Sequence, residues 1–401
     1  MLSTTSYLIA VWLGKLVNWF AVNFNLGAGG TWPGHLALKT CPGVLRRLEV
    51  QLQLGSILIS GTNGKTTTAS LIENILSESG LTVVANPSGA NLINGLVSAF
   101  ITDATFWGRP ISQIGVFEVD EGNLPFALSS FTPELLILLN LSRDQLDRYG
   151  EIDSTIAKWL KAILKLPRTT KIILKKDDPY LSRLAESLSA AGFIVRLFSK
   201  EEPGDFTSPL SGDFNRLNTN AAVLGSRQLG ITDLIIRRGL KNFQPAFGRG
   251  EEVKLVSGKS IIILLAKNPE SQNENLIFLR SLLPQSLSAV ATYPALLFVL
   301  NDNIPDGRDV SWIYDIDFEK HRDWLFRCPL FISGTRERDL TLRLKYAGIP
   351  VPDSTHRCSS NLRDILAEAI ASLRPNQKLF ILPTYSAMLQ ARKILTGKGI
   401  E

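Results

Sequence analysis

The chain has 401 residues, of which 45% are apolar and 20% are charged. It is therefore a globular, multidomain protein with enough apolar residues for two or three cores, and extended disorder is excluded. Lys and Arg exceed Asp and Glu by only six charges without long basic runs, so we predict no nucleic-acid partner. Three cysteines lie far apart, which predicts reduced thiols in a cytoplasmic protein and excludes a disulfide framework: Cys41, Cys328 and Cys358.

The first 24 residues are strongly apolar around one lysine, Lys15. No basic residue precedes the apolar run, and Lys15 with Asn18 interrupts it short of the roughly 20 residues that cross a membrane. We therefore predict neither a signal peptide nor a transmembrane span, but an N-terminal helical segment over residues 1–54 that packs on the body. A helix lying on the inner membrane surface is the alternative.

Short β-rich runs alternate with amphipathic windows between Ser56 and Phe243. The expected strands are Ser56–Ser60, Thr82–Ala85, Ile114–Glu118, Leu135–Asn140, Lys171–Leu174 and Ile194–Phe198. The expected helices include Thr66–Ser79, Ser154–Leu164, Tyr180–Ala191 and Leu217–Gln228. Such alternation predicts an α/β domain over residues 55–244, with a mostly parallel sheet and helices on both faces.

A segment rich in turn formers, Gln244–Glu251, separates this domain from a second one over residues 245–401. Apolar runs in the second domain predict strands at Ile261–Leu265, Ala295–Leu300, Leu330–Ser333 and Leu379–Leu382. Helical windows include Asn361–Ser372 and Ser386–Leu395. We predict a smaller three-layer α/β domain.

A glycine-rich loop follows the first expected strand and opens the first expected helix of the central domain. It comprises Gly61, Thr62, Asn63, Gly64, Lys65, Thr66 and Thr67. Small residues let backbone N–H groups approach phosphate oxygens at the positive end of a helix, while Lys65 supplies charge and Thr66 a hydroxyl for Mg²⁺. The loop therefore predicts a triphosphate site.

Three carboxylates come where the third strand should end, among them Glu118. Hard oxygen ligands at a strand end suit Mg²⁺ that bridges nucleotide phosphates. We predict a magnesium site made by Thr66 and Glu118, with Lys65 and Glu118 as catalytic residues.

Only two residues separate Gly61 from the Gly64-Lys65 pair, and this short loop resembles that of the Mur ligase family. The polar run from Asn140 to Glu151 is similar to a family segment, but Gln145 stands where that segment has a metal-binding histidine. This substitution leaves a second metal undecided. By the same resemblance, Asn215 and Asn218 bind the nucleotide, and Arg249 reaches ATP from the domain boundary. Helix capping is the alternative role of the two asparagines.

Segments of the second domain resemble the MurT branch of that family: Ala266–Pro269, Asn301–Asp315, Ser333–Arg336 and Pro383–Ser386. The resemblance implies a Mur ligase-like synthetase subunit that uses ATP and Mg²⁺. It implies amidation of the α-carboxylate of D-glutamate in the lipid II stem peptide, through an acyl phosphate, at the membrane surface. No cysteine lies in a recognisable nucleophile motif, so ammonia would come from a GatD-like glutamine amidotransferase subunit in a heterodimer.

In the family, an aspartate of the second domain completes the partner's catalytic site. The candidates are Asp306 and Asp309, ahead of Asp315, and the sequence does not choose between them. A loop that satisfies its own turn is the alternative role of these carboxylates. Several family members carry a four-cysteine zinc ribbon where this chain has the cysteine-free stretch 199–211, so we expect no zinc.

Two other functions stay open from the sequence. One is an amino-acid-adding Mur ligase or a folylpolyglutamate-type ligase, in which we would expect the histidine that Gln145 replaces. The other is a non-catalytic P-loop module that regulates a partner. The carboxylate-rich second domain argues against the latter, since a switch needs no second ligand crevice.

Overall fold

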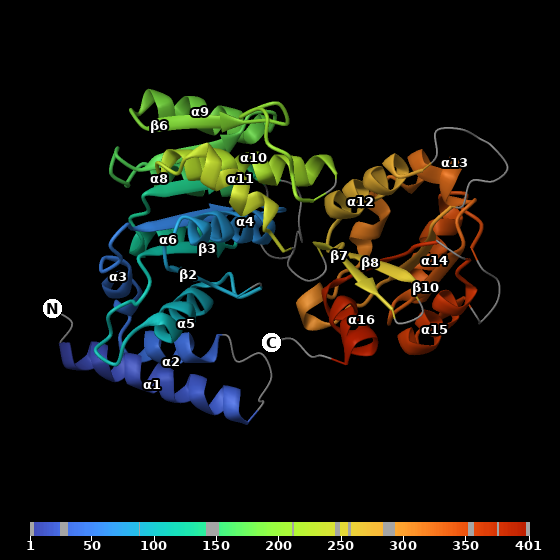
Figure 1. Ribbon diagram of the computed structural model, residues 1–401, viewed down its shortest axis with the longest axis horizontal. Coiled ribbons are helices and arrows are strands. Elements are labelled where there is room, and N and C mark those ends of the chain that lie inside the picture. The colour runs from blue at the N-terminus through green and yellow to red at the C-terminus, as the bar shows by residue number, and fades with distance from the viewer. Residues whose placement is uncertain are drawn as a thin grey trace. The chain divides into compact units, whose positions relative to one another are not determined.

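The computed structural model describes residues 4–24, 31–87, 89–141, 152–210, 212–244, 249–255, 258–283, 293–351, 357–374 and 377–397. The chain divides into two compact units, unit 1 (residues 1–244) and unit 2 (residues 245–401) (Figure 1). Each unit contains a six-stranded, mostly parallel sheet between helices, which confirms the predicted α/β fold class. A boundary at residue 54 within unit 1 stays a prediction.

The sheet of unit 1 has the strand order β2-β3-β1-β4-β5-β6, and all its strand pairs are parallel. The strands are β1 (Ser56–Ser60), β2 (Val83–Ala85), β3 (Ile114–Val119), β4 (Leu135–Leu138), β5 (Lys171–Lys175) and β6 (Ile194–Phe198). Ser60, the last residue of β1, pairs with Val119 of β3 and Leu138 of β4. The carboxyl ends of these three strands therefore meet at one edge.

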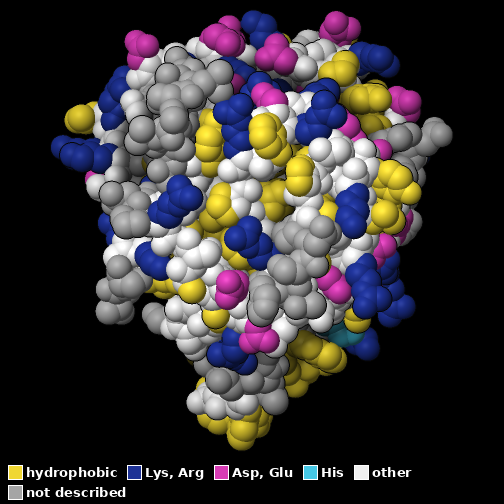
Figure 2. All heavy atoms as spheres, turned by 90° about the vertical axis from the view of Figure 1, so that its right-hand side faces the viewer, with side chains coloured by type: hydrophobic (Ala, Val, Ile, Leu, Met, Phe, Trp, Pro, Cys, Tyr) yellow, Lys and Arg dark blue, Asp and Glu magenta, His cyan; other side chains and the backbone are white. Residues whose placement is uncertain are grey.

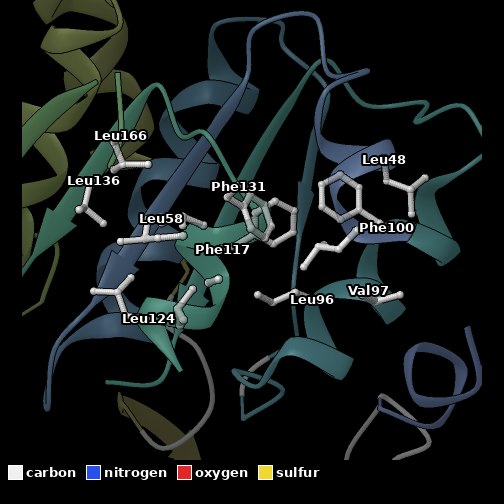
Figure 3. Packing of buried hydrophobic residues seen from close by; sticks show 14 of the residues in the cluster. Leu48, Leu58, Leu96, Val97, Phe100, Phe117, Leu124, Phe131, Leu136 and Leu166 are labelled. Atoms are coloured by element: carbon white, nitrogen blue, oxygen red, sulfur yellow. The ribbon is translucent and has the colours of Figure 1, made fainter. Parts of the chain in front are cut away.

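Helices cover both faces of this sheet because alternate side chains of each strand point in opposite directions. Ile57 and Ile59 of β1 pack in the core beneath α4 (Lys65–Glu78), α10 (Asp213–Gln228) and α11 (Asp233–Lys241), whereas Leu58 packs in the opposite core. That second core is formed with α5 (Ile93–Asp103), α6 (Leu124–Ser130), α8 (Ile152–Ile163) and α9 (Pro179–Ala190). Figure 3 shows Phe100, Phe117 and Phe131 at its centre, where the Phe117 and Phe131 ring centroids are 5.4 Å apart.

Three N-terminal helices extend the same core: α1 (Thr4–Asn23), α2 (Trp32–Thr40) and α3 (Val44–Glu49). Gly34 of α2 lies so close to α5 that a Cβ atom on it would come within 1.9 Å of the Asn94 carbonyl oxygen. Its N–H donates to Ser98 Oγ at 2.8 Å. The predicted packing of the first helix on the body is confirmed, and no helix within the described ranges has the length and hydropathy to cross a bilayer.

The sheet of unit 2 has the order β11-β10-β9-β12-β8-β7, and only the β7–β8 pair among its described strands is antiparallel. Its strands are β7 (Arg249–Lys254), β8 (Ser260–Leu264), β9 (Ala295–Val299), β10 (Leu330–Ser333), β11 (Cys358–Ser359) and β12 (Leu379–Pro383). One face packs against α12 (Pro269–Ser281), η2 (Ser311–Asp315), η3 (Phe318–His321), α13 (Arg322–Leu325) and α14 (Glu337–Tyr346), while η1 (Ile304–Asp306) contacts α16. The other face packs against α15 (Leu362–Ser372) and α16 (Tyr385–Thr396).

Several element boundaries differ from the sequence prediction, three of them near residues of the predicted site. The β7 strand begins at Arg249, inside the expected turn segment, because backbone pairing with β8 supports a charged edge strand that has no apolar pattern. The α10 helix begins at Asp213 instead of Leu217. The β4 strand ends at Leu138 instead of Asn140, and Asn140 turns towards the glycine-rich loop.

Candidate active site

The glycine-rich loop lies between the carboxyl end of β1 and the start of α4. Gly64 has φ +88°, and a Cβ atom there would come within 2.2 Å of Asn218 Oδ1. A Cβ atom on Gly61 would come within 2.9 Å of the Asn140 carbonyl oxygen. The first N–H groups of a helix have no intrahelical acceptor and carry the positive end of its dipole. The loop thus presents bare backbone where a phosphate can approach it.

Asn140 at the end of β4 fixes the conformation of this loop. Its Oδ1 accepts a hydrogen bond from Asn63 N at 2.8 Å, and its Nδ2 donates to Asn63 O at 2.9 Å. Its carbonyl oxygen accepts from Thr62 N at 3.1 Å. Three bonds to one residue hold the middle of the loop in place before any ligand binds.

Lys65 is a buried cation within this loop, with 6% of its surface exposed. Its Nζ lies 3.0 Å from Glu121 Oε2 and donates to the carbonyl oxygens of Thr62, at 3.3 Å, and Gly61. Burial opposes the charge, but Glu121, Asp120 and Glu118 outweigh it and hold the pKa of Lys65 above its ordinary value. Lys65 therefore keeps its positive charge at neutral pH.

Thr66 and Glu118 form an oxygen pair beside Lys65. Thr66 Oγ1 donates to Glu118 Oε2 at 2.6 Å, and Glu118 Oε1 accepts from Gly89 N at 3.1 Å. Asn86 aligns the strand end, since its Oδ1 accepts from Glu118 N at 2.9 Å and its Nδ2 donates to Glu118 O at 3.0 Å. Glu118 is only 3% exposed, so its carboxylate has a fixed position.

The Thr66 and Glu118 oxygens fit Mg²⁺. This ion prefers hard oxygen ligands and commonly takes one or two carboxylates together with substrate phosphates. Within the described ranges, no group of three or more His, Cys, Asp or Glu residues is arranged to hold a metal. The donor set suits an ion that is shared with a phosphate ligand. The absence of zinc remains a prediction.

The remaining candidate nucleotide-binding residues in the described structure lie in α10 and α4. Asn218 lies against Gly64 and is 6% exposed, so it is next to the loop. Asn215 is also 6% exposed. Both belong to α10, whose N-cap is Gly212, so neither caps this helix. Thr67 is buried in the first turn of α4.

Two parts of the predicted site cannot be located. The polar run around Gln145 lies outside the described residues, and so does the side chain of Arg249. Their roles stay predictions.

Asp306 lies at the carboxyl edge of the unit 2 sheet and is 5% exposed. Its carboxylate accepts hydrogen bonds from Ser386 N, at 2.7 Å, and from Ser386 Oγ. Asn301 Nδ2 and Asn303 Nδ2 donate to the same hydroxyl at 2.9 and 2.8 Å. Ser386 is in the first turn of α16, so this carboxylate stabilises the start of the helix.

The two other candidate aspartates are exposed on the same segment. Asp309 Oδ1 accepts from Ser311 N at 2.8 Å, and this bond holds the pKa of Asp309 below its ordinary value. Asp315 ends η2. The segment is anchored by the buried Arg343, which donates to Ile313 O at 3.1 Å and Ile316 O at 2.6 Å. Asp309 is therefore ionised on a fixed loop.

Comparison with known proteins decides the family. Residues 59–207 match the Mur ligase middle domain, and residues 265–388 match the MurT ligase C-terminal domain. A Staphylococcus aureus protein, the MurT subunit of lipid II isoglutaminyl synthase (glutamine-hydrolyzing), is 31% identical over 86% of this chain and 88% of its own length. The chain belongs to the MurT family. The protein of the same name from Streptococcus pneumoniae is 28% identical over 94% of both chains.

The fold is shared more widely than the MurT family. The crystal structure of the MurF ligase from Thermotoga maritima in complex with ADP superposes with a TM-score of 0.65. It covers 89% of this chain and 82% of that one, at 16% sequence identity. At this identity the likeness shows the fold alone.

Sequence reasoning did not predict the specific contacts of three residues that shape this candidate site: Glu121, Asn86 and Asn140. Glu121 lies in the same acidic run as Glu118, but the run alone does not show which carboxylate faces Lys65. Asn86 follows β2, and its partner Glu118 is 32 residues away. Only their position at one sheet edge could have indicated these contacts.

Proposed function

We propose that this chain is the synthetase subunit of a lipid II isoglutaminyl synthase. It would amidate the α-carboxylate of D-glutamate in the lipid II stem peptide to D-isoglutamine, with ATP and Mg²⁺, at the cytoplasmic face of the membrane. The observation that carries the proposal is a phosphate loop with Lys65, Thr66 and Glu118 in a chain whose other unit matches the MurT C-terminal domain. Relatives that are named as subunits of lipid II isoglutaminyl synthase support this reaction.

The proposed chemistry has two steps because a carboxylate cannot expel oxide. In the first, a carboxylate oxygen forms a bond to the γ-phosphorus of ATP, and ADP leaves with the electrons of the broken P–O bond. In the second, ammonia attacks the acyl carbon, loses a proton, and inorganic phosphate leaves. Lys65 and the α4 N-terminus offset negative charge on the transferred group. Mg²⁺, held by Thr66 and Glu118, would supply further charge neutralisation.

A separate glutaminase would supply the ammonia, and we propose a GatD-like amidotransferase subunit that forms a heterodimer with this chain. The cysteines of this chain are poor nucleophile candidates. Cys41 is fully buried, and burial raises the pKa of Cys328 to about 12, so neither is an accessible thiolate. Cys358 lies 3.4 Å from the Thr341 hydroxyl, and no basic group in the described structure is shown to activate it.

Among the three aspartates, we propose Asp309 as the carboxylate offered to the partner. It is exposed and ionised, whereas Asp306 is buried and its carboxylate accepts bonds from Ser386. Asp315 is exposed as well and is the second choice.

Mass spectrometry of lipid II after incubation with this chain, Mg-ATP and a high concentration of ammonium tests the synthetase proposal. Ammonium replaces the glutaminase, so the chain's own reaction is isolated. A product about one mass unit lighter, the difference between a hydroxyl and an amino group, is expected. Nucleotide binding without product would overturn the proposal in favour of amino-acid addition or regulation.

Glutamine hydrolysis by the reconstituted complex tests the partner assignment. Asp309→Ala should reduce hydrolysis about tenfold or more, while ammonium-dependent amidation by this chain stays unchanged, because the phosphate loop is intact. Asp315→Ala is the matched control, since Asp315 is exposed on the same segment. Wild-type hydrolysis in the Asp309 variant would refute the assignment.

A further inference from the structure

The α1 helix is apolar on both of its faces. Tyr7, Ala10 and Val11 of its inner face are buried in the core of unit 1. The outer face carries large apolar side chains that are 38 to 62% exposed: Ile9, Trp12, Leu16, Trp19 and Phe20, followed by Phe24. A helix on a water-facing surface normally turns charged and polar residues outward. This outer face therefore suits a second apolar environment.

The loop between α5 and β3 adds to this outer face. Phe106 is 62% exposed and Trp107 is 71% exposed. The Trp12 ring stacks on Phe106 with 5.1 Å between centroids, and Trp12 Nε1 donates to Phe106 O at 2.9 Å. Tyr7 also donates from its hydroxyl to Gly108 O, so the loop is fastened to α1.

We call these rings the aromatic surface: Trp12, Trp19, Phe20, Phe24, Phe106 and Trp107. In Figure 2, hydrophobic side chains gather at the lowest part of the molecule, the level at which α1 lies in Figure 1. Exposed apolar patches of this kind mark sites of association with proteins or membranes.

The segments that carry the aromatic surface have an excess of positive charge, with Asp103 at the end of α5 as an acidic residue near Lys15. Residues 1–54 contain four Lys or Arg residues, Lys15, Lys39, Arg46 and Arg47, and a single acidic residue, Glu49. Glu49 is only 4% exposed, so its charge does not face the solvent. Arg109 adds an exposed positive charge on the loop of Phe106. This balance complements a surface of anionic phosphates.

We propose that the aromatic surface docks unit 1 on the interface of an anionic phospholipid bilayer. Trp and Phe rings are favoured at the depth of the headgroups, and nearby Lys and Arg residues pair with lipid phosphates. The positive charge favours a membrane over a second copy of the chain, which would bring the same charges together. The inference rests on the proposed function, because docking of unit 1 on the bilayer would bring the phosphate site close to a lipid-linked substrate.

Co-sedimentation of the full chain with vesicles tests this inference without ATP, ammonium or lipid II. Vesicles of phosphatidylcholine with phosphatidylglycerol should bind the wild type, and vesicles of phosphatidylcholine alone should bind it more weakly. The double variant Trp19→Ser with Phe20→Ser should bind about tenfold or more weakly, because two exposed rings no longer enter the interface. Leu342→Ser with Tyr346→Ser removes similarly exposed side chains from α14 and is the matched control.

Equal binding by the wild type and the Trp19 and Phe20 variant, or no binding to anionic vesicles, would overturn the inference. So would a wild-type dimer that this variant converts to a monomer in sedimentation velocity, because a second copy would then cover the surface. A further assay separates this inference from the proposed function. The variant should amidate a short-chain, water-soluble lipid II analogue at the wild-type rate, yet amidate vesicle-embedded lipid II more slowly.

Discussion

Each unit has a mostly parallel sheet with polar residues at its carboxyl edge, but the buried charged residues of the two units have different surroundings. In unit 1, Lys65 and Glu121 are paired and buried beside open helix N–H groups. In unit 2, the buried Asp306 is bonded to the first turn of α16, and Arg343 binds two backbone carbonyls and the Glu319 carboxylate.

The sheet topology brings polar side chains to the same edge in both units. The residues that surround those side chains then determine whether they can bind a ligand. Lys65 lies beside the first N–H groups of α4, where its ammonium can contact a bound phosphate, so the edge in unit 1 suits phosphoryl chemistry. The Asp306 carboxylate and the Arg343 guanidinium instead bind groups of the protein itself, Ser386 for the former and Glu319 with two carbonyl oxygens for the latter, and so hold their loops in place. Unit 2 thus suits the presentation of exposed groups such as Asp309.

Removing Lys65 tests the phosphate side of this comparison and should have the largest effect. Lys65→Ala should reduce ammonium-dependent amidation about a thousandfold or more, because the charge that offsets the transferred phosphoryl group is lost. It should also lower the free energy of unfolding by about 3 kcal/mol, because Glu121 stays buried without its cation.

The double variant Lys65→Ala with Glu121→Gln separates these two effects. It should recover most of the stability, measured by denaturant unfolding, and none of the activity. Lys39→Ala, an exposed lysine on α2, is the control and should change neither. Amidation near the wild-type rate in the double variant would show that Lys65 is not needed for phosphoryl transfer at this edge of unit 1.

Arg343 tests whether unit 2 uses its buried cation to hold a loop. Arg343→Ala should lower the free energy of unfolding by about 2 to 4 kcal/mol, because the Ile313 and Ile316 carbonyl oxygens lose their donor. Arg338 lies on the same helix with its side chain 94% exposed, so Arg338→Ala should cost little. Equal losses in the two variants would contradict the anchoring role.

Asp306 tests the helix-stabilising role of a buried carboxylate. Asp306→Ala should lower the free energy of unfolding by about 1 to 2 kcal/mol, since Ser386 N and Oγ lose their acceptor at the start of α16. Asp309→Ala should have a smaller effect on stability, because Asp309 is exposed. A larger loss of thermal stability in Asp309→Ala than in Asp306→Ala would show that Asp306 does not stabilise the start of α16.

Glu49 can be compared with Glu121 in the same unit, because both carboxylates are buried but only Glu121 is paired with a lysine. Burial raises its pKa above 4.5, although Ser56 and Thr132 donate to it. Because the folded-state pKa is raised, the contribution of Glu49 to stability is full at low pH and is lost as pH rises through that pKa. Glu49→Gln keeps an acceptor and carries no charge.

The stability of Glu49→Gln relative to the wild type should therefore increase between pH 4.5 and neutrality, by about 1 kcal/mol or less. Denaturant unfolding at several pH values measures this difference. A variant that loses relative stability as pH rises would show that the ionised form of Glu49 is the stabilising one.

The sequence was sufficient for the local parts of this site. The spacing of Gly61, Gly64 and Lys65, between an apolar run and a helical window, placed the loop correctly at the end of β1 because strand, turn and helix are consecutive. Alternation of strands and helices likewise predicted the strands of the unit 1 sheet and four of the six described strands in unit 2, since it determines which side chains can be buried.

The parts that sequence reasoning missed depend on contacts between distant residues or on backbone pairing. Lys65 and Glu121 are separated by 56 positions, and Asn63 and Asn140 by 77. The charged strand β7 has no apolar pattern of its own and is stabilised through its partner β8. The local sequence therefore contains no pattern that predicts these distant contacts or the strand β7.

The packing of α1 against α5 has a consequence for synthesis on the ribosome. The α5 helix ends about 80 residues after α1 does, so at 5 to 20 residues per second its completion follows by roughly 4 to 16 seconds. During that interval α1 can pack on α2, but its inner face lacks α5, the other helix that later contacts it. The nascent chain would thus offer an apolar helix to chaperones or lipid before unit 1 is complete.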